Sequence, residues 1–388
     1  MNKKCLCVTY FLRSQRGGIQ AYLRYLEKGL TQYGWQVEII FLDDVIPLPI
    51  LGGRSWIAGL FRTSPLLRNL FDNWRVSATK NLLKKLAITV EKRVLIQRPD
   101  VIHAQDPYAA FAVLPLAQDK KIPLVITNHG PVMRESEFGP GYKNFVDLME
   151  RTAYQNAKAI ILVGEHLKSS VLPKASDTPY FVIHNAIDIE DFLAKGQKEY
   201  LNLPKSYILI VARLDPEKGV DVGLRAFQQV LEKHSDLNLI IVGDGRLRGE
   251  LKKLAFRLGI TKRIQFLGWV SSNNVSALYR KAKIVWITSR PFRNIQEPLG
   301  IVALEAMVWG RPIVASQIGG LAEIFSKGGA LLVPPDNPQK LAEATLTFLK
   351  DSLLAKKISE EAQKIARENY DIDQWIKKIL DVYSKVQK

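Results

Sequence analysis

The feature that most constrains the fold is an alternation of short apolar runs with helical patterns. Runs this short, each followed by an amphipathic segment, are typical of strands in a mostly parallel sheet. In the first half of the chain these runs are Cys5–Leu12, Val37–Leu42, Val101–Ala104, Leu124–Thr127, Ala159–Val163 and Tyr180–Ile183. The chain therefore begins with an expected α/β domain.

The same alternation restarts after a polar stretch that reaches Lys205. Its apolar runs are Tyr207–Ala212, Leu237–Val242, Ile264–Leu267, Ile284–Thr288, Pro312–Ala315 and Ala330–Val333. Two separate starts predict two Rossmann-like domains, residues 1–188 and 189–371, facing across a cleft. Because open α/β sheets bind ligands beyond the carboxyl ends of their strands, the functional site is expected at those ends.

The last part of the chain is helical in pattern. One helical pattern runs from Gln339 to Glu368, and a second follows from Tyr370 to Gln387 with apolar residues at helical spacing. We expect residues 372–388 to form a terminal helix that packs back on the first domain.

Composition excludes several classes of protein. Of 388 residues, 47% are hydrophobic, yet no apolar run approaches the ~20 residues that a membrane-spanning helix needs. The only cysteines, Cys5 and Cys7, share one face of a strand and cannot make a disulfide framework or a zinc site. These features fit a cytoplasmic protein.

The net charge of +17 is concentrated in part between Val45 and Arg98, where ten basic residues face two acidic ones. Apolar side chains such as Trp56 are interleaved with them, a mixture that favours an anionic membrane surface as a partner. The alternative is ordinary helices whose apolar faces pack on the first sheet. No recognisable nucleic-acid motif accompanies the basic stretch, so no nucleic acid is expected as a partner.

Two cations follow the first strand of the second domain. Arg213 comes directly after this strand, and Lys218 follows it by five residues. Two cations at the mouth of a sheet suit a diphosphate, which Arg can contact bidentately. The alternative is an ion-pair cluster of Arg213 and Lys218 with Asp215 and Glu217.

A second motif spans Glu297 to Glu305. Pro298 fits an early helical position, Gly300 permits a close approach, and free amides at a helix start can hold phosphate. Glu297 then faces the helix mouth, while Glu305 lies about two turns further on, where a carboxylate suits sugar hydroxyls. The alternative for Glu305 is a paired structural acid.

Other strand ends carry weaker signals. Glycine pairs or near-pairs open helices at Gly17-Gly18, Gly243-Asp244-Gly245 and Gly319-Gly320, and for each the alternative is an ordinary tight turn. His103 and His129 are expected near strand ends of the first sheet, toward the cleft. For His103 we favour a structural, hydrogen-bonded role.

Taken in order and spacing over nearly the whole chain, these motifs resemble the retaining GT-B glycosyltransferases of glycosyltransferase family 4. The matching segments are Gly17-Gly18, His129, Asn185–Asp188, Arg213 with Glu217–Gly219, Val242–Gly245, Phe266–Gly268, Glu297–Glu305 and Gly319-Gly320. The chain departs from the commoner family residues at Ala186, Ala212, Pro298 and Leu299.

The resemblance implies roles for single residues. Arg213 and Lys218 would hold the diphosphate of a nucleotide-sugar donor, Glu305 would bind its ribose, and Glu297 would position the transferred sugar. The remaining implied donor contacts are the backbone of Leu299, Gly300 and Ile301 at the sugar, Leu267 and Val270 near the base, His129 beside the sugar, and the Gly17-Gly18 loop over the phosphate.

The implied reaction moves a hexose-type sugar from a nucleotide-diphosphate sugar to a glycan or lipid-linked acceptor and retains its anomeric configuration. It implies no metal and no cofactor besides this co-substrate. Alternatives are a sugar-nucleotide epimerase or phosphorylase of the same fold, against which the spacing of Glu297 and Glu305 with Arg213 and Lys218 argues, and a basic nucleic-acid-binding protein.

Overall fold

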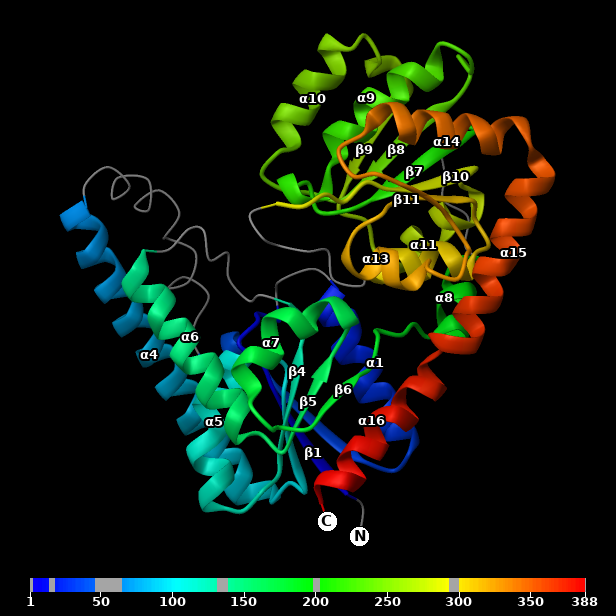
Figure 1. The fold of residues 1–388 in the computed structure, drawn as a ribbon. Helices are drawn as coiled ribbons and strands as arrows, with labels where there is room; N and C mark the ends of the chain where they lie inside the picture. Colours follow the sequence, from blue (N-terminus) through cyan, green and yellow to red (C-terminus); the bar gives the residue numbers. More distant parts are fainter. Residues whose placement is uncertain are drawn as a thin grey trace. The chain divides into compact units, whose positions relative to one another are not determined.

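The computed structural model describes residues 3–13, 18–45, 65–130, 139–197, 203–292 and 300–387. The chain forms two compact units (Figure 1). The first contains Met1–Ile183 and Ile376–Lys388, and the second contains His184–Trp375.

The first unit is built on a six-stranded parallel sheet with the order β2-β1-β3-β4-β5-β6. Its strands are β1 (Lys4–Val8), β2 (Gln36–Ile40), β3 (Val101–Ala104), β4 (Leu124–Asn128), β5 (Ala159–Leu162) and β6 (Tyr180–Val182). Its main helices are α1 (Gly18–Gln32), α4 (Pro65–Gln97), α5 (Pro107–Asp119), α6 (Pro140–Asn156) and α7 (Lys168–Ala175), to which α16 (Ile372–Val386) contributes from Ile376 onward.

Both faces of this sheet are covered, which explains its continuous apolar strands. Along β1, Leu6 and Val8 join a core cluster with Leu86 of α4. Cys5 and Cys7 point to the other face, where their buried sulfur atoms lie 3.7 Å apart as free thiols. The prediction that the two cysteines share one face is confirmed.

The C-terminal helix α16 closes that second face. A Cβ added to Gly29 of α1 would lie 3.0 Å from the side chain of Ile376, so the glycine allows the two helices to approach closely. Further along α16, the hydroxyl of Tyr383 lies 2.7 Å from Nδ1 of His103 in β3. Packing and hydrogen bonding together attach the end of the chain to the first unit.

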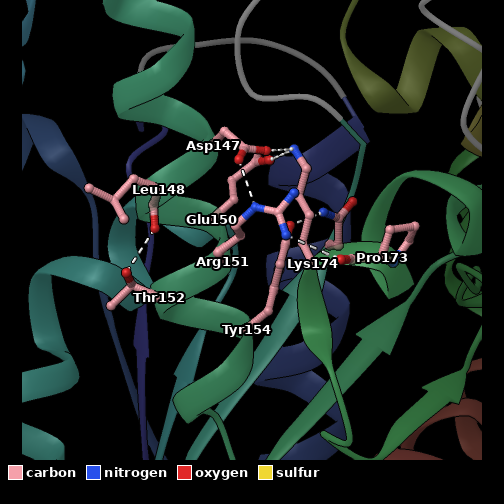
Figure 2. Close-up of polar contacts among 9 residues, drawn as sticks. Asp147, Leu148, Glu150, Arg151, Thr152, Tyr154, Pro173 and Lys174 are labelled. Carbon is pink, nitrogen blue, oxygen red and sulfur yellow. Dashed lines mark hydrogen bonds and ion pairs between the residues drawn. The ribbon is translucent and has the colours of Figure 1, made fainter.

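Helices α6 and α7 are joined by charged groups (Figure 2). Lys174 Nζ lies 2.6 Å from a carboxylate oxygen of Glu150 and 3.2 Å from one of Asp147. Arg151 pairs with the same Asp147 at 2.7 Å and donates to the carbonyl of Pro173 at 3.3 Å. These contacts hold α7 against α6 at the edge of the unit.

The second unit also has a six-stranded parallel sheet, ordered β9-β8-β7-β10-β11-β12. Its strands are β7 (Tyr207–Val211), β8 (Asn238–Val242), β9 (Ile264–Gly268), β10 (Ile284–Ile287), β11 (Ile313–Ser316) and β12 (Leu331–Val333). Its helices are α8 (Ile189–Lys195), α9 (Val220–Leu231), α10 (Arg248–Arg257), α11 (Ser272–Lys281), α12 (Ile301–Val308), α13 (Gly319–Ile324), α14 (Pro338–Lys350) and α15 (Ser352–Asn369). The strand order reverses between β7 and β10, where such sheets bind ligands.

Each expected strand is present, but two details of the predicted elements are wrong. The first strand ends at Val8 and not at Leu12, because Thr9 and the amide of Tyr10 turn to donate to the buried carboxylate of Asp106. The pattern from Gln339 to Glu368 is two helices, because Asp351 ends α14 and caps α15 by accepting from the amide of Leu354.

A parallel β-bridge between Ile187 and Asp371 lies close to both unit boundaries in the sequence. Ile187 donates to the carbonyl of Tyr370 at 2.9 Å and accepts from the amide of Ile372 at 3.2 Å. This bridge keeps residues 184–188 with the second unit, whereas the sequence pattern had assigned them to the first. Within the described ranges, no helix combines the length and apolarity needed to cross a bilayer.

Candidate active site

Arg213 lies at the carboxyl end of β7, where the strand order reverses. Its guanidinium donates to Asp215 at 2.8 Å and to Glu217 at 2.9 Å. The Arg213 part of the ion-pair alternative is therefore present in the structure. The side chain nevertheless keeps 53% of its surface exposed, so the two carboxylates hold a cation that remains accessible to a ligand.

Lys218 ends a short 3-10 helix, Pro216–Lys218, that is fixed to the end of β10. The hydroxyl of Thr288 donates to the carbonyl of Lys218 at 2.7 Å. Gly219 has a φ of +57°, and a Cβ there would lie 2.1 Å from the carbonyl oxygen of Thr288. Only glycine permits this close approach of the two loops.

Arg290, which the sequence analysis did not select, anchors the same loop. Its Nε donates to the carbonyl of Pro216 at 2.7 Å, and its backbone amide donates to that of Glu217 at 2.9 Å. Its guanidinium also pairs with Asp221 at 3.2 Å and Asp336 at 2.9 Å. The sequence pattern that could have pointed to Arg290 is an arginine just after a buried strand, the same pattern as at Arg213.

The loop after β8 packs on the segment that carries Arg213. A Cβ on Gly243 would lie 1.9 Å from the carbonyl oxygen of Ala212, and one on Gly245 would lie 2.6 Å from that of Leu214. These glycines therefore serve a close backbone approach, beyond an ordinary turn. Gly243 also donates to the carbonyl of Gly268 at 2.7 Å, which brings the end of β9 to this edge of the sheet.

The remaining predicted donor residues lie on β9, just beyond it and on α12. Leu267 is half-buried and Val270 is buried. Gly300 is the N-cap of α12 without a side-chain cap, and Ile301 is its first residue. Glu305 is half-buried beside Tyr279 of α11: burial raises the pKa of the Tyr279 hydroxyl well above its usual range, and the carboxylate of Glu305 raises it further.

Several predicted residues lie outside the described residues: Gly17, Glu297, Pro298 and Leu299. Their neighbours are described. Gly18 is the first residue of α1, and Gly319 has a φ of +47° at the start of α13, which fits the tight-turn interpretation of that pair.

His129 follows β4 in the first unit, and its ring is held on two sides. Its Nε2 lies 3.2 Å from Oε1 of Gln105, and its ring meets that of Tyr22 edge-on at 4.5 Å between centroids. The ring is only partly accessible, and burial lowers its pKa to about 3. His129 is therefore a neutral hydrogen-bonding group at physiological pH.

His103 is a structural residue, which confirms the favoured interpretation. It lies within β3 with no exposed surface, and its two ring nitrogens each lie 2.7 Å from a hydroxyl, of Tyr383 and of Thr127. The Thr127 hydroxyl in turn lies 3.3 Å from that of Tyr22. A buried polar chain thus connects α16 to the residue that packs on His129.

Asp106 organises the neighbouring strand ends. It caps α5 by accepting from the amide of Ala109 at 2.8 Å and fixes the end of β1 by accepting from the amide of Tyr10 at 2.7 Å. Burial raises its pKa to about 6. Among the described side chains, no group of three or more His, Cys, Asp or Glu is arranged to hold a metal ion.

Comparison with known proteins identifies the family. The family described as Glycosyltransferase Family 4 matches residues 16–191, and the family described as Glycosyl transferases group 1 matches residues 192–365. Together the two matches span residues 16–365. The chain belongs to the glycosyltransferases of family 4.

Relatives and solved structures agree with this assignment. An uncharacterized glycosyltransferase of Methanocaldococcus jannaschii is 29% identical over 95% of this chain and 94% of its own. The alpha-D-kanosaminyltransferase of Streptomyces kanamyceticus is 24% identical over 72% of this chain and 74% of its own.

Two solved structures share the fold of this glycosyltransferase. Anabaena HepE, in complex with UDP and glucose, has a TM-score of 0.72 at 21% identity and covers 98% of this chain and 99% of its own. Sucrose-phosphate synthase from Thermosynechococcus elongatus has a TM-score of 0.76 at 19% identity, with 99% of both chains covered. The architecture of two parallel α/β units is thus that of the GT-B glycosyltransferases.

Proposed function

We propose that this glycosyltransferase transfers a hexose-type sugar from a nucleotide-diphosphate sugar to a glycan or lipid-linked acceptor, with retention of anomeric configuration. The observation that carries the proposal is the pair Arg213 and Lys218, fixed at the strand-order reversal of the second sheet by Glu217 and Arg290. Anabaena HepE, a structural neighbour, is known in complex with UDP-glucose, which supports a donor of this class.

Charge development in the reaction explains the need for these cations. As the bond between the anomeric carbon and the diphosphate oxygen breaks, negative charge grows on the leaving diphosphate. Arg213 and Lys218, together with the uncapped amides at the start of α12, would stabilise that charge without reorganisation. The acceptor oxygen then bonds to the anomeric carbon from the same face, and its proton passes to the leaving phosphate.

The other proposed donor contacts are those that the resemblance to family 4 implies. Glu305 would accept hydrogen bonds from the ribose, and the end of β9 near Leu267 and Val270 would meet the base. Glu297 and the backbone of Leu299–Ile301 would position the transferred sugar. His129, as a neutral ring, would form a hydrogen bond with a sugar hydroxyl and would not act as a general acid.

A thermal-shift screen against a panel of nucleotide sugars tests donor binding, since a ligand at 100 times its Kd stabilises a protein by roughly 2.7 kcal/mol. The donor that shifts the transition is then incubated with candidate acceptors, and NMR of the product reports the configuration at the anomeric carbon. No shift with any nucleotide sugar would remove the donor-site proposal. An inverted product would remove retention alone.

We also propose that the basic stretch from Val45 to Arg98 brings the enzyme to the cytoplasmic face of an anionic membrane. Residues 46–64 of this stretch lie outside the described residues, and the rest is mostly α4. On α4, the side chains of Lys80, Lys84 and Lys85 are exposed, which supports attraction to anionic lipid. Replacing these three lysines by Glu should lower recovery with anionic vesicles, and equal recovery would contradict the proposal.

A further inference from the structure

Helix α10 of the second unit lies in a second, separate concentration of positive charge. Between Arg246 and Arg263 the chain has seven basic residues and one acidic residue, Glu250. One side of α10 is buried through Leu251 and Leu254, which join the core of the unit. The charge is therefore gathered on the opposite, solvent-facing side of the helix.

The exposed side of α10 also carries an aromatic ring. Phe256 follows Lys252 by four residues and Lys253 by three, so the three side chains are neighbours on one helical face. The Phe256 side chain is 77% exposed, and Lys252, Lys253 and Arg257 are exposed around it. We call these four residues the α10 face.

In the described part of the chain, only two of the seven cations of this region pair with an acid. Arg246 pairs with Asp215 and Arg248 with Asp244. In contrast, none of the ion pairs among the described residues involves Lys252, Lys253, Arg257, Lys262 or Arg263. A cluster of unpaired cations around an apolar ring attracts an extended anionic surface.

We propose that the α10 face docks on an anionic lipid bilayer. The positive side chains of the α10 face meet lipid phosphate, while Phe256 enters the boundary between headgroups and acyl chains. Interfacial amphipathic helices bind membranes in this arrangement. A nucleic acid would match the charge equally well. The ring, however, projects from the outer face of a helix, whereas single-stranded nucleic acid is held in grooves whose aromatic side chains stack on successive bases.

Vesicle co-sedimentation of the full chain tests the proposal, with phosphatidylcholine vesicles that contain or lack phosphatidylglycerol. All proteins carry Lys80, Lys84 and Lys85 replaced by Glu, so that α4 cannot hide the contribution of α10. Binding to the anionic vesicles should persist in this background and weaken with salt. Replacing Lys252, Lys253 and Arg257 by Glu should then lower the partition coefficient about 100-fold or more, and Phe256→Ser should lower it about tenfold.

A matched control carries Lys356→Glu, Lys357→Glu and Lys364→Glu on α15, an equal change in net charge at exposed positions of the same unit. It should bind nearly as well as the background protein. Absence of vesicle binding in the background, equal losses in the control, or unchanged binding of Phe256→Ser would overturn the proposal. So would charge reversal on α10 that abolishes binding to RNA but not to vesicles. Nucleotide-sugar thermal shifts, measured in parallel, report on folding and on the donor site independently.

Discussion

The amide oxygen of Gln105 lies 3.2 Å from Nε2 of His129. An amide oxygen only accepts hydrogen bonds, so the Nε2 of this neutral ring carries its proton and Nδ1 remains an acceptor. Burial lowers the pKa of His129 to about 3, which keeps the ring in this neutral form at physiological pH. Gln105 is thus a positioning residue for His129.

In Gln105→Met the side chain fills nearly the same volume but lacks the amide oxygen. The proton of the neutral His129 ring should then no longer be held on Nε2. The lost hydrogen bond is worth about 0.5–1.5 kcal/mol, so donor turnover should fall about two- to tenfold. Nitrogen NMR of the labelled histidine ring should show a mixture of tautomers in place of the Nε2–H form. An unchanged ring spectrum in the folded variant would contradict the positioning role.

Glu305→Gln should weaken nucleotide-sugar binding because the ribose would lose a charged acceptor. Hydrogen bonds to charged groups are worth about 1.5–3 kcal/mol, which corresponds to roughly a 10- to 150-fold rise in Kd. Calorimetric titration with the donor measures this change. Glu343→Gln, on the exposed side of α14, is the matched control and should leave Kd unaltered. Equal affinities of wild type and Glu305→Gln would remove Glu305 from the site.

Arg213→Ala and Lys218→Ala should each reduce kcat more than they destabilise the fold, because both cations act most strongly on leaving-group charge. Steady-state kinetics and thermal unfolding of the same samples separate the two effects. A rise in KM at constant kcat would show that the cations bind substrate and transition state equally.

Arg290→Leu should differ from those variants. Arg290 holds the loop of Lys218 through the carbonyl of Pro216 and pairs with Asp221 and Asp336, so its loss should lower both kcat and the melting temperature. Thermal unfolding of Arg290→Leu beside Arg213→Ala, whose side chain is 53% exposed, checks this prediction. Greater destabilisation by Arg213→Ala would contradict the anchoring role of Arg290.

The sequence predicted the strands well because each is a local run of apolar residues that the sheet buries on both faces, as at Ile208 and Leu209 of β7. It also pointed to Arg213 and His129, since each directly follows such a run. It did not predict Arg290 or Gln105, because their roles depend on partners distant in sequence, such as Asp336 and His129. Likewise, the break at Asp351 depends on a single capping bond that helical periodicity does not register.

Activity should be unchanged in a chelator. The proposed stabilisation of the diphosphate comes from Arg213, Lys218 and helix amides, so removal of divalent cations should leave kcat and KM the same. Donor turnover measured in excess EDTA, with and without added Mg²⁺ or Mn²⁺, checks this. Loss of turnover that either metal restores would show that a metal ion shares the role of the two cations.

Acid should destabilise the first unit through His103. Burial lowers the pKa of His103 to about 3 in the folded state, whereas an ordinary histidine has a pKa of about 6.5, so between these values the unfolded chain binds the extra proton. The contribution of His103 to the free energy of unfolding is therefore fully present above pH 6.5 and falls as the pH is lowered toward 3. Between pH 7 and pH 5 the loss should be about 2 kcal/mol.

His103→Gln removes this titration, so its stability should depend less steeply on pH than that of the wild type. The variant should be the less stable protein at pH 7, since it loses the hydrogen bonds to Tyr383 and Thr127. The difference in free energy of unfolding between the two proteins should be about 2 kcal/mol smaller at pH 5. Hydrogen exchange of the amides of β3 and β4 measures the first unit alone. His129 and Asp106 titrate in both proteins and cancel in the comparison. Parallel pH dependences of the two proteins would show that His103 is not the group that the acid protonates on unfolding.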